Sequence, residues 1–194
     1  QHGVKFMEQN LTNNREAIYD QIREIYGKLV YSFTTHLKDS KIVSKRSNFL
    51  KLLNIILSAV STGGIIAVLI DWNATLCGIL TSILTTTILV ISTYLKYANL
   101  DEVIISHRNT ANNLWLIREK VVSLLTDFSF LTNEEIRSKR DIYILEISRI
   151  YSSELNTSEK AYRMAQSALK NKEEQYFSDT ELDDILPKQL RKKK

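Results

Sequence analysis

The chain has 194 residues, of which 26 are Lys or Arg and 22 are Asp or Glu, so its formal net charge is +4. A single cysteine, Cys77, excludes an internal disulfide and a Cys-rich zinc site, and three scattered histidines form no metal-ligand spacing. Five Gly and one Pro are too few for an all-β sandwich or barrel. With no Gly-rich phosphate loop and no nucleophile elbow, the sequence argues against an enzyme, and we expect no cofactor and no metal.

The first quarter of the chain has the pattern of a long amphipathic helix. Residues 1–10 precede that pattern, and we expect them to be disordered or foreign to the natural chain, because the first methionine is Met7. From residue 11 to 48, apolar side chains recur near helical spacing, with charges between them. These side chains are Leu11, Ile18, Ile22, Ile25, Leu29, Tyr31 and Phe33. The pattern predicts a helix over 11–48.

An apolar block follows, in which one charged residue, Asp71, interrupts the 44 positions from 52 to 95. Residues 52–70 are 19 uncharged positions, about 29 Å of helix, which matches the hydrocarbon core of a bilayer. Residues 74–95 are long enough to span with some tilt. Only residues 71–73 are left as a connector, so the block predicts an antiparallel transmembrane hairpin.

The flanks of this hairpin predict its orientation. We expect Trp72 at one membrane interface, and Tyr94 and Tyr97 at the other. The connector has no basic residue, whereas both flanks of the hairpin do. The basic residues before the first span are Lys38, Lys41, Lys45, Arg46 and Lys51, and those after the second are Lys96 and Arg108. Both termini should therefore lie in the cytoplasm. A signal peptide does not fit two spans that start about 50 residues in, and a soluble buried hairpin is the open alternative.

The remaining sequence predicts cytoplasmic helices that form a bundle. The apolar pattern does not break after the second span, so that span should continue directly into a helix over 96–128. Thr132 and Glu135 form a capping box that predicts a helix over 133–155. Residues 156–159, NTSE, have the pattern of a second cap, which predicts a break there and a last helix over 158–175. The fold class is thus an all-α membrane protein, a transmembrane hairpin with long cytoplasmic helices before and after it.

Residues 176–194 change from acidic to basic and contain Pro187, which ends any helix there. We interpret them as a solvated, partly disordered tail, and the alternative is contact of the basic end with anionic lipid headgroups. Four terminal basic residues without interleaved aromatic residues do not favour direct DNA binding.

Polar residues in the spans are the candidates for function. They fall on one face of each span, Asn54, Ser58 and Ser61 in the first and Thr75, Ser82, Thr86 and Thr93 in the second. A small-residue ridge, Ala59, Gly63 and Ala67, permits close helix packing. These polar side chains either pack helices or, in a homo-oligomer, line a shared interior without selecting the sign of an ion. Beyond the spans, His107 and Arg108 are a surface or interhelical pair, or else a pH sensor or a contact for a ligand or partner.

Several stretches resemble the SLATT domain, the SMODS- and SLOG-associating two-transmembrane effector. The first are residues 45–52, KRSNFLKL, and 58–64, SAVSTGG, followed by a short connector and a Thr-rich second span. The others are residues 94–97, YLKY, 107–119, HRNTANNLWLIRE, and 123–127, SLLTD. The resemblance covers roughly residues 10 to 175, which we therefore take as one domain, 11–175.

The resemblance implies an effector of bacterial anti-phage conflict that oligomerises in the inner membrane and forms or gates a pore when infection is sensed. It also implies partners, namely a cyclic nucleotide, a nucleotide synthase of the SMODS type, a SLOG-type sensor or a reverse transcriptase. The alternative function is a non-conducting membrane anchor whose cytoplasmic helices dock such a synthase or reverse transcriptase.

Overall fold

In a computed structural model of the chain, the structure describes residues 2–69, 73–187, 189, 191 and 192. These residues form helices and no strand, which confirms the all-α fold class. The helices are α1 (His2–Leu69), α2 (Ala74–Ala98), α3 (Leu100–Thr126), α4 (Asn133–Ser153), α5 (Glu159–Asn171) and α6 (Asp179–Ile185).

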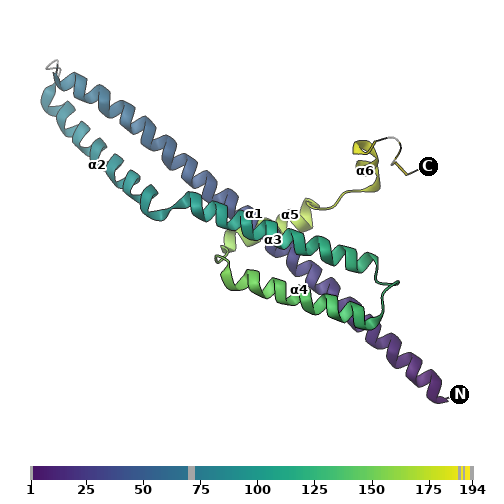
Figure 1. The fold of residues 1–194 in the computed structure, drawn as a ribbon. Coiled ribbons are helices and arrows are strands. Elements are labelled where there is room, and N and C mark those ends of the chain that lie inside the picture. Colours follow the sequence, from purple (N-terminus) through teal and green to yellow (C-terminus); the bar gives the residue numbers. More distant parts are fainter. Residues whose placement is uncertain (1, 70–72, 188, 190, 193–194) are drawn as a thin grey trace.

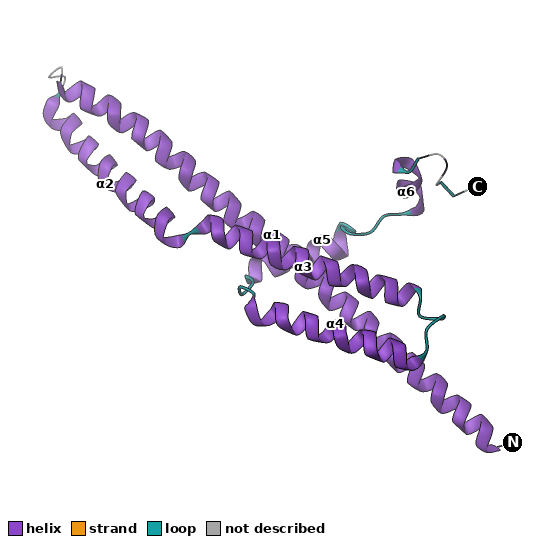
Figure 2. Cartoon of the chain, in the orientation of Figure 1, coloured by secondary structure: helices purple, strands orange, loops and turns teal. Residues whose placement is uncertain are grey.

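Two parts of the molecule follow each other along α1 (Figures 1 and 2). The C-terminal half of α1 and the antiparallel α2 form the expected hairpin, which projects from one end of the molecule. The N-terminal half of α1 packs against α3, α4 and α5 in a helical bundle. The short α6 lies to one side of both parts. The expected connector lies largely outside the described residues, Trp72 and Asp71 included.

The first helix is longer than the sequence analysis expected. α1 has 68 residues and joins the two predicted helices, 11–48 and 52–70, into one. It begins at His2, so residues 2–10 are helical and not the disordered start that was expected. The physical reason is that no proline stands between residues 2 and 69, and a helix once nucleated adds each further residue at little free-energy cost.

The expectation that the second span runs unbroken into the next helix is wrong. Asn99 has a φ of 43° and a ψ of 45°, a left-handed conformation that ends α2 and begins α3. Asn tolerates this conformation better than other non-glycine residues. The Asn99 side chain donates a hydrogen bond to Glu102. Asp101 and Glu102 in the first turn of α3 also complement the positive end of its helix dipole.

The two helix starts predicted after residue 128 are confirmed. Thr132 and Glu135 form the reciprocal capping box that starts α4. The hydroxyl of Ser158 accepts a hydrogen bond from the backbone N–H of Ala161 and starts α5. The acidic stretch of the tail is helical, contrary to the expectation of a partly disordered tail. It forms α6, which begins at a second capping box between Ser178 and Glu181.

The core of the bundle lies where α1, α3 and α4 meet. Its fully buried side chains include Ile22 and Leu29 from α1, Leu114 and Val121 from α3, and Ile136 from α4. Helix α5 approaches α1 through three alanines, Ala161, Ala165 and Ala168, all buried. Alanines at this spacing form one narrow face, so α5 lies close to its neighbour.

Two buried polar contacts hold the ends of these helices on α1. The carboxylate of Asp39, buried on α1, accepts hydrogen bonds from the backbone N–H of Ser158 at 2.8 Å and from its hydroxyl at 2.6 Å. Arg15 donates to the carbonyl oxygens of Phe128 and Leu131 in the turn between α3 and α4. Charge-assisted hydrogen bonds of this kind are stronger than neutral ones, so α1 fixes both turns of the bundle.

Replacement of Leu114 by alanine should destabilise the bundle by about 2–5 kcal/mol, because it leaves a cavity in the fully buried core. The matched control is Leu116→Ala, whose side chain lies two positions away and is 53% exposed; it should cost no more than about 0.5 kcal/mol. The measurement is denaturant unfolding of both variants in one detergent. Equal losses of stability would contradict the position of the core.

Candidate functional site

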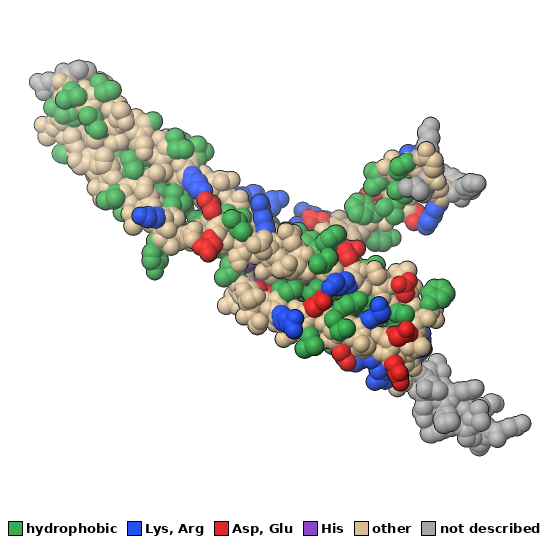
Figure 3. All heavy atoms as spheres, in the orientation of Figure 1, with side chains coloured by type: hydrophobic (Ala, Val, Ile, Leu, Met, Phe, Trp, Pro, Cys, Tyr) green, Lys and Arg blue, Asp and Glu red, His purple; other side chains and the backbone are tan. Residues whose placement is uncertain are grey.

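The outer surface of the α1–α2 hairpin is apolar and exposed. Only 6% of the most apolar window of α1, and none of that of α2, is buried within the protein. Exposed side chains there include Ile55, Ile66, Leu76, Ile79 and Leu89. In Figure 3 the charged side chains lie on the bundle and at its junction with the hairpin, whereas the far part of the hairpin shows hydrophobic ones. A soluble core helix would be buried, so this surface fits a membrane.

The two spans pack against each other through a narrow seam. On α1 the seam consists of the inward positions Asn54, Leu57, Ser61, Gly64 and Val68, which alternate in steps of three and four residues. Ser61 is 4% exposed. Gly64 marks the closest approach, because a Cβ built there would overlap the hydroxyl of Thr81 on α2. A glycine at this point therefore permits close contact of the two helices.

Asn54 finds its polar partner inside the hairpin. Its amide group donates a hydrogen bond to the hydroxyl of Ser92 at 3.2 Å, and the Ser92 hydroxyl lies 3.4 Å from its amide oxygen. These two contacts reduce the free-energy cost of placing a side-chain amide in a membrane span. Of the three polar residues predicted on the first span, Asn54 and Ser61 thus belong to the seam, and Ser58 is exposed.

The polar face predicted on the second span points away from the first span. Thr75, Ser82, Thr86 and Thr93 are all exposed. At 100° per residue their mean direction is roughly opposite to the seam positions of α2, which include Thr81, Leu84, Ile88 and Ile91. The hydroxyls of Ser82 and Thr86 donate to the carbonyl oxygens of Gly78 and Ser82. Their oxygen lone pairs still face outward, where a single hairpin would meet lipid.

The small-residue ridge of α1 also points away from its partner span. Ala59 and Gly63 are exposed and lie roughly opposite to the seam, and Ala67 is half-buried. A Cβ built on Gly63 would meet no atom within 4 Å. The ridge therefore takes no part in the hairpin, which uses the adjacent Gly64 instead. Each span therefore has one face that does not contact the other span, the small-residue ridge on α1 and the hydroxyl face on α2.

The junction between hairpin and bundle carries the charged and aromatic residues expected at a membrane surface. Lys51 forms an ion pair of 2.7 Å with Asp101 at the start of α3, and Ser47 donates to the same carboxylate. The Arg46 guanidinium lies 5.3 Å from the ring centre of Tyr94, a cation–π contact. Tyr97 is 91% exposed, and exposed tyrosines are typical of the membrane interface.

A buried histidine pair connects α1 and α3 further from the hairpin. The Nδ1 atoms of His36 and His107 are 2.9 Å apart, and the two side chains are 1% and 4% exposed. The other ring nitrogen of His36 lies 3.2 Å from a carboxylate oxygen of Glu154, which ends α4. Three helices therefore meet in one chain of hydrogen bonds. Arg108, by contrast, is exposed, so it and His107 face opposite environments.

The geometry of the pair fixes its proton positions. When Glu154 is ionised it accepts, so His36 carries a proton on Nε2 and accepts from the Nδ1–H of His107. A second proton on His36 would place two N–H groups against each other. Burial, and next the neighbouring His107, lower the pKa of His36 to about 4, and Asp39 opposes this shift. Burial raises the pKa of Glu154.

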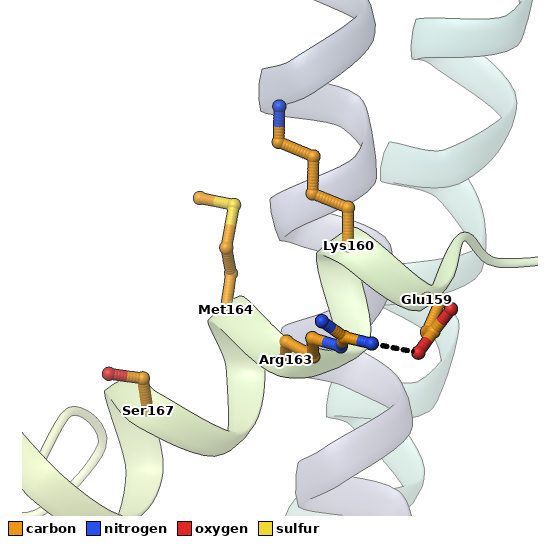
Figure 4. Close-up of a pocket in the computed structure, with 5 residues that line it drawn as sticks. All are labelled: Glu159, Lys160, Arg163, Met164 and Ser167. Carbon is orange, nitrogen blue, oxygen red and sulfur yellow. Dashed lines mark hydrogen bonds and ion pairs between the residues drawn. The ribbon is translucent and has the colours of Figure 1, made fainter.

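An open depression of about 400 Å³ on α5 is not a site of this kind. Figure 4 shows its lining residues, Glu159, Lys160, Arg163, Met164 and Ser167, all of which come from α5. Glu159 and Arg163 pair with each other. With one helix as its wall, the depression encloses nothing. Among the described residues, no three His, Cys, Asp or Glu side chains are arranged to hold a metal ion.

The fold and the exposed hairpin define the class as an all-helical membrane protein with two spans and a bundle on one side of the membrane. The family model of the SMODS and SLOG-associating 2TM effector domain family 4 matches residues 18–181. The chain therefore belongs to this family of two-transmembrane effector domains, which is associated with anti-phage systems. Comparisons with curated proteins and with solved structures gave no match.

Acidification should weaken the bundle through His36. An unfolded histidine takes up a proton near pH 6.5, whereas folded His36 does so only near pH 4. The stability that neutral His36 gives is complete above pH 6.5 and falls by at most about 3 kcal/mol as the pH drops to 4. Thermal unfolding in detergent should show this loss between pH 7.5 and 5, and His36→Gln should reduce it.

Glu154 changes stability in the opposite direction, because its raised pKa favours proton uptake by the folded state. Glu154→Gln should therefore steepen the loss of stability on acidification. Parallel profiles of wild type and His36→Gln would show that the histidine pair does not carry the pH dependence.

Proposed function

We propose that this chain is an oligomeric effector of the bacterial inner membrane that forms or gates a pore. The observation that carries the proposal is the outward polar face of α2, Thr75, Ser82, Thr86 and Thr93, opposite to the hairpin seam. In a single hairpin this face would lie against acyl chains. Several copies placed around an axis would turn it toward a shared, hydrated interior.

The second outward face supports the same arrangement. Ala59 and Gly63 on α1 leave room for a neighbouring helix to approach closely. If α2 lines the interior, the ridge on α1 is free to contact the next copy. One heterologous contact repeated around an axis closes a ring. The lining would consist of neutral hydroxyl groups, so the pore would select weakly between cations and anions.

In this proposal both termini and the bundle lie in the cytoplasm, where a signal can reach them. The basic residues at the junction, such as Lys45 and Lys51, favour this orientation. The proposed trigger is a cyclic nucleotide or a protein partner, either a nucleotide synthase of the SMODS type, a SLOG-type sensor or a reverse transcriptase. The family name supports association with SMODS and SLOG proteins.

Replacement of Thr86 by leucine should reduce ion leakage, because it removes a hydroxyl from the middle of the proposed lining. Thr87→Leu is the matched control, since Thr87 is also exposed and also bonds to the carbonyl four residues before it, but lies about 100° away around α2. We expect at least a fivefold loss of dye or ion efflux for Thr86→Leu. Efflux from cells that express the chain with its trigger is the measurement, with protein confirmed in the membrane.

Two outcomes would contradict the proposal. A wild-type chain that reaches the membrane and is triggered, yet leaves the membrane potential and growth normal, does not open a pore. Equal effects of Thr86→Leu and Thr87→Leu would show that this face of α2 does not line the path. Asn54→Leu is not a suitable probe of the lining, because Asn54 pairs with Ser92 inside the hairpin.

Gly63→Ile should lower the oligomeric state and leave the fold of the single chain intact. A larger side chain at Gly63 meets open space within the protein, so it disturbs only contacts with another copy. Gly64→Ile is the contrasting variant, because its side chain would overlap Thr81 and separate the spans. Mass determination in detergent and helix content by circular dichroism distinguish the two effects. An unchanged assembly of Gly63→Ile would exclude the ridge from the interface.

A non-conducting anchor is the second candidate, and one surface favours it. Ile105, Trp115 and Leu116 on α3 are 57%, 45% and 53% exposed, on the side of α3 that faces away from the core. A partner such as a nucleotide synthase or reverse transcriptase would cover them. The efflux experiment separates the two functions, because an anchor binds its partner without any leakage.

A further inference from the structure

Two neighbouring cavities on the helical bundle share part of their lining between α1, α4 and α5, and together they are called the recess. The larger, about 520 Å³, is lined by Glu24, Gly27, Lys28, Tyr31, Ser32, Tyr151 and Tyr162. The smaller, about 110 Å³, extends toward the histidine pair and is lined by Tyr31, Ser32, Thr35, His36, Glu154, Thr157 and Tyr162. They share Tyr31, Ser32 and Tyr162, so a molecule in the outer cavity lies beside the opening of the inner one.

Three tyrosines from three different helices line the open outer cavity. Tyr31 comes from α1, Tyr151 from α4 and Tyr162 from α5. The rings of Tyr31 and Tyr162 have their centres 6.1 Å apart and are tilted by 30°. The hydroxyl of Tyr151 is held by that of Ser32 at 3.0 Å. A cation that lies over the exposed face of one of these rings, within about 6 Å of its centre, makes a cation–π interaction.

Gly27 keeps the recess open. It stands in the middle of α1, where glycine costs about 1 kcal/mol of helix stability relative to alanine, and this cost needs a compensating reason. Packing does not supply one, because a Cβ at Gly27 would meet no atom within 4 Å. A side chain there would instead occupy part of the recess that Gly27 lines.

The charge of the lining favours a cation. Among the described lining residues the carboxylates are Glu24 and Glu154, and Lys28 is held by Glu24 at 2.7 Å. His36 is neutral at pH 7, because burial lowers its pKa to about 4. The carboxylate of Glu154 is therefore left with His36 as a neutral donor and no cation of its own. A polyanion such as a nucleotide would find no free positive charge here.

We propose that this recess binds a small organic ammonium ion, with the tyrosine rings around its alkyl groups and the carboxylate of Glu154 as counter-ion. Aromatic rings next to a carboxylate are the means by which proteins recognise quaternary ammonium groups. Lipid headgroups are excluded as the source, because Tyr31 precedes the first span by 21 residues of continuous helix, about 31 Å. The ligand is thus a soluble cytoplasmic cation.

The position of the site connects it to the membrane spans. Glu154 bonds to His36 on α1, which bonds in turn to His107 on α3. A cation that draws the Glu154 carboxylate into the recess weakens its bond to His36 and changes the hydrogen bonding of His107. Helix α3 is separated from the second span by Asn99 alone. The site does not depend on the pore proposal, since binding occurs with or without conductance.

Isothermal titration of the full chain in a maltoside detergent tests the proposal, with tetramethylammonium and choline as probes and sodium chloride as the ionic control. The wild type should bind one tetramethylammonium ion per chain with saturation. Tyr162→Leu should weaken binding at least about fivefold, whereas Tyr162→Phe, which keeps the ring, should stay within about twofold. Tyr176→Leu, on an exposed residue that does not line the recess, should bind as the wild type does.

Glu154→Gln should weaken binding about tenfold, because it removes the counter-ion. Binding by the wild type should also weaken as the pH falls through the raised pKa of Glu154, and this dependence should vanish in Glu154→Gln. Thermal unfolding shows whether each variant is folded. If Tyr162→Leu does not fold, the comparison of Glu154→Gln with the wild type still tests the site.

Three results would overturn the proposal. The first is no saturable binding of either ammonium ion by the folded wild type. The second is equal weakening by Tyr162→Phe and Tyr162→Leu, which would assign the effect to the hydroxyl and not to the ring. The third is tighter binding of adenosine monophosphate than of tetramethylammonium, unchanged in Glu154→Gln, which would make the recess an anion site. Each of these results can be obtained with a wild-type chain that causes efflux when triggered. They therefore overturn the ammonium site without contradicting the proposed pore.

Discussion

The exposed apolar surface of the hairpin is the constraint on which the rest of the structure depends. Side chains such as Ile55 and Leu89 cannot face water at this density, so the spans must lie in lipid. Lipid then requires each backbone group of the spans to bond within its own helix. Because two spans return the chain to the side from which it entered, the charged helices lie together on one side, where Lys51 and Asp101 mark the boundary.

The two spans are joined to the bundle in different ways. α1 continues without interruption from the core position Ile22 to the seam position Gly64, so it holds span and bundle in a fixed relation. The other span meets the bundle at Asn99, a single left-handed residue. A rearrangement of α3 can therefore change this one pair of dihedral angles and turn α2, which carries the outward hydroxyl face, against α1. This asymmetry gives the bundle a mechanical route to the membrane.

Local signals explain what the sequence predicted well. The capping residues Thr132 and Ser158 act on N–H groups two or three positions away, so their motifs are visible in a single sequence. The break at Asn99 also had a local signal, the acidic pair that follows it, but the apolar period on both sides concealed it. The His36–His107 contact joins residues 71 positions apart and had none. Nor does sequence tell Gly63 from Gly64, because only the register of the hairpin decides which one meets Thr81.

The buried histidine pair explains how a weak event at the surface of the bundle can affect α3. The Nδ1 atoms of His36 and His107 share a single proton, so the arrangement has discrete alternatives and cannot adjust gradually. Its outer end, Glu154, directly follows the last residue of α4 and lines the inner cavity of the tyrosine-lined recess. Because both histidines are almost fully buried, water cannot replace a lost partner. A change at Glu154 must therefore be met by a new tautomer or by separation of α1 from α3, and the second of these moves the helix that leads to α2.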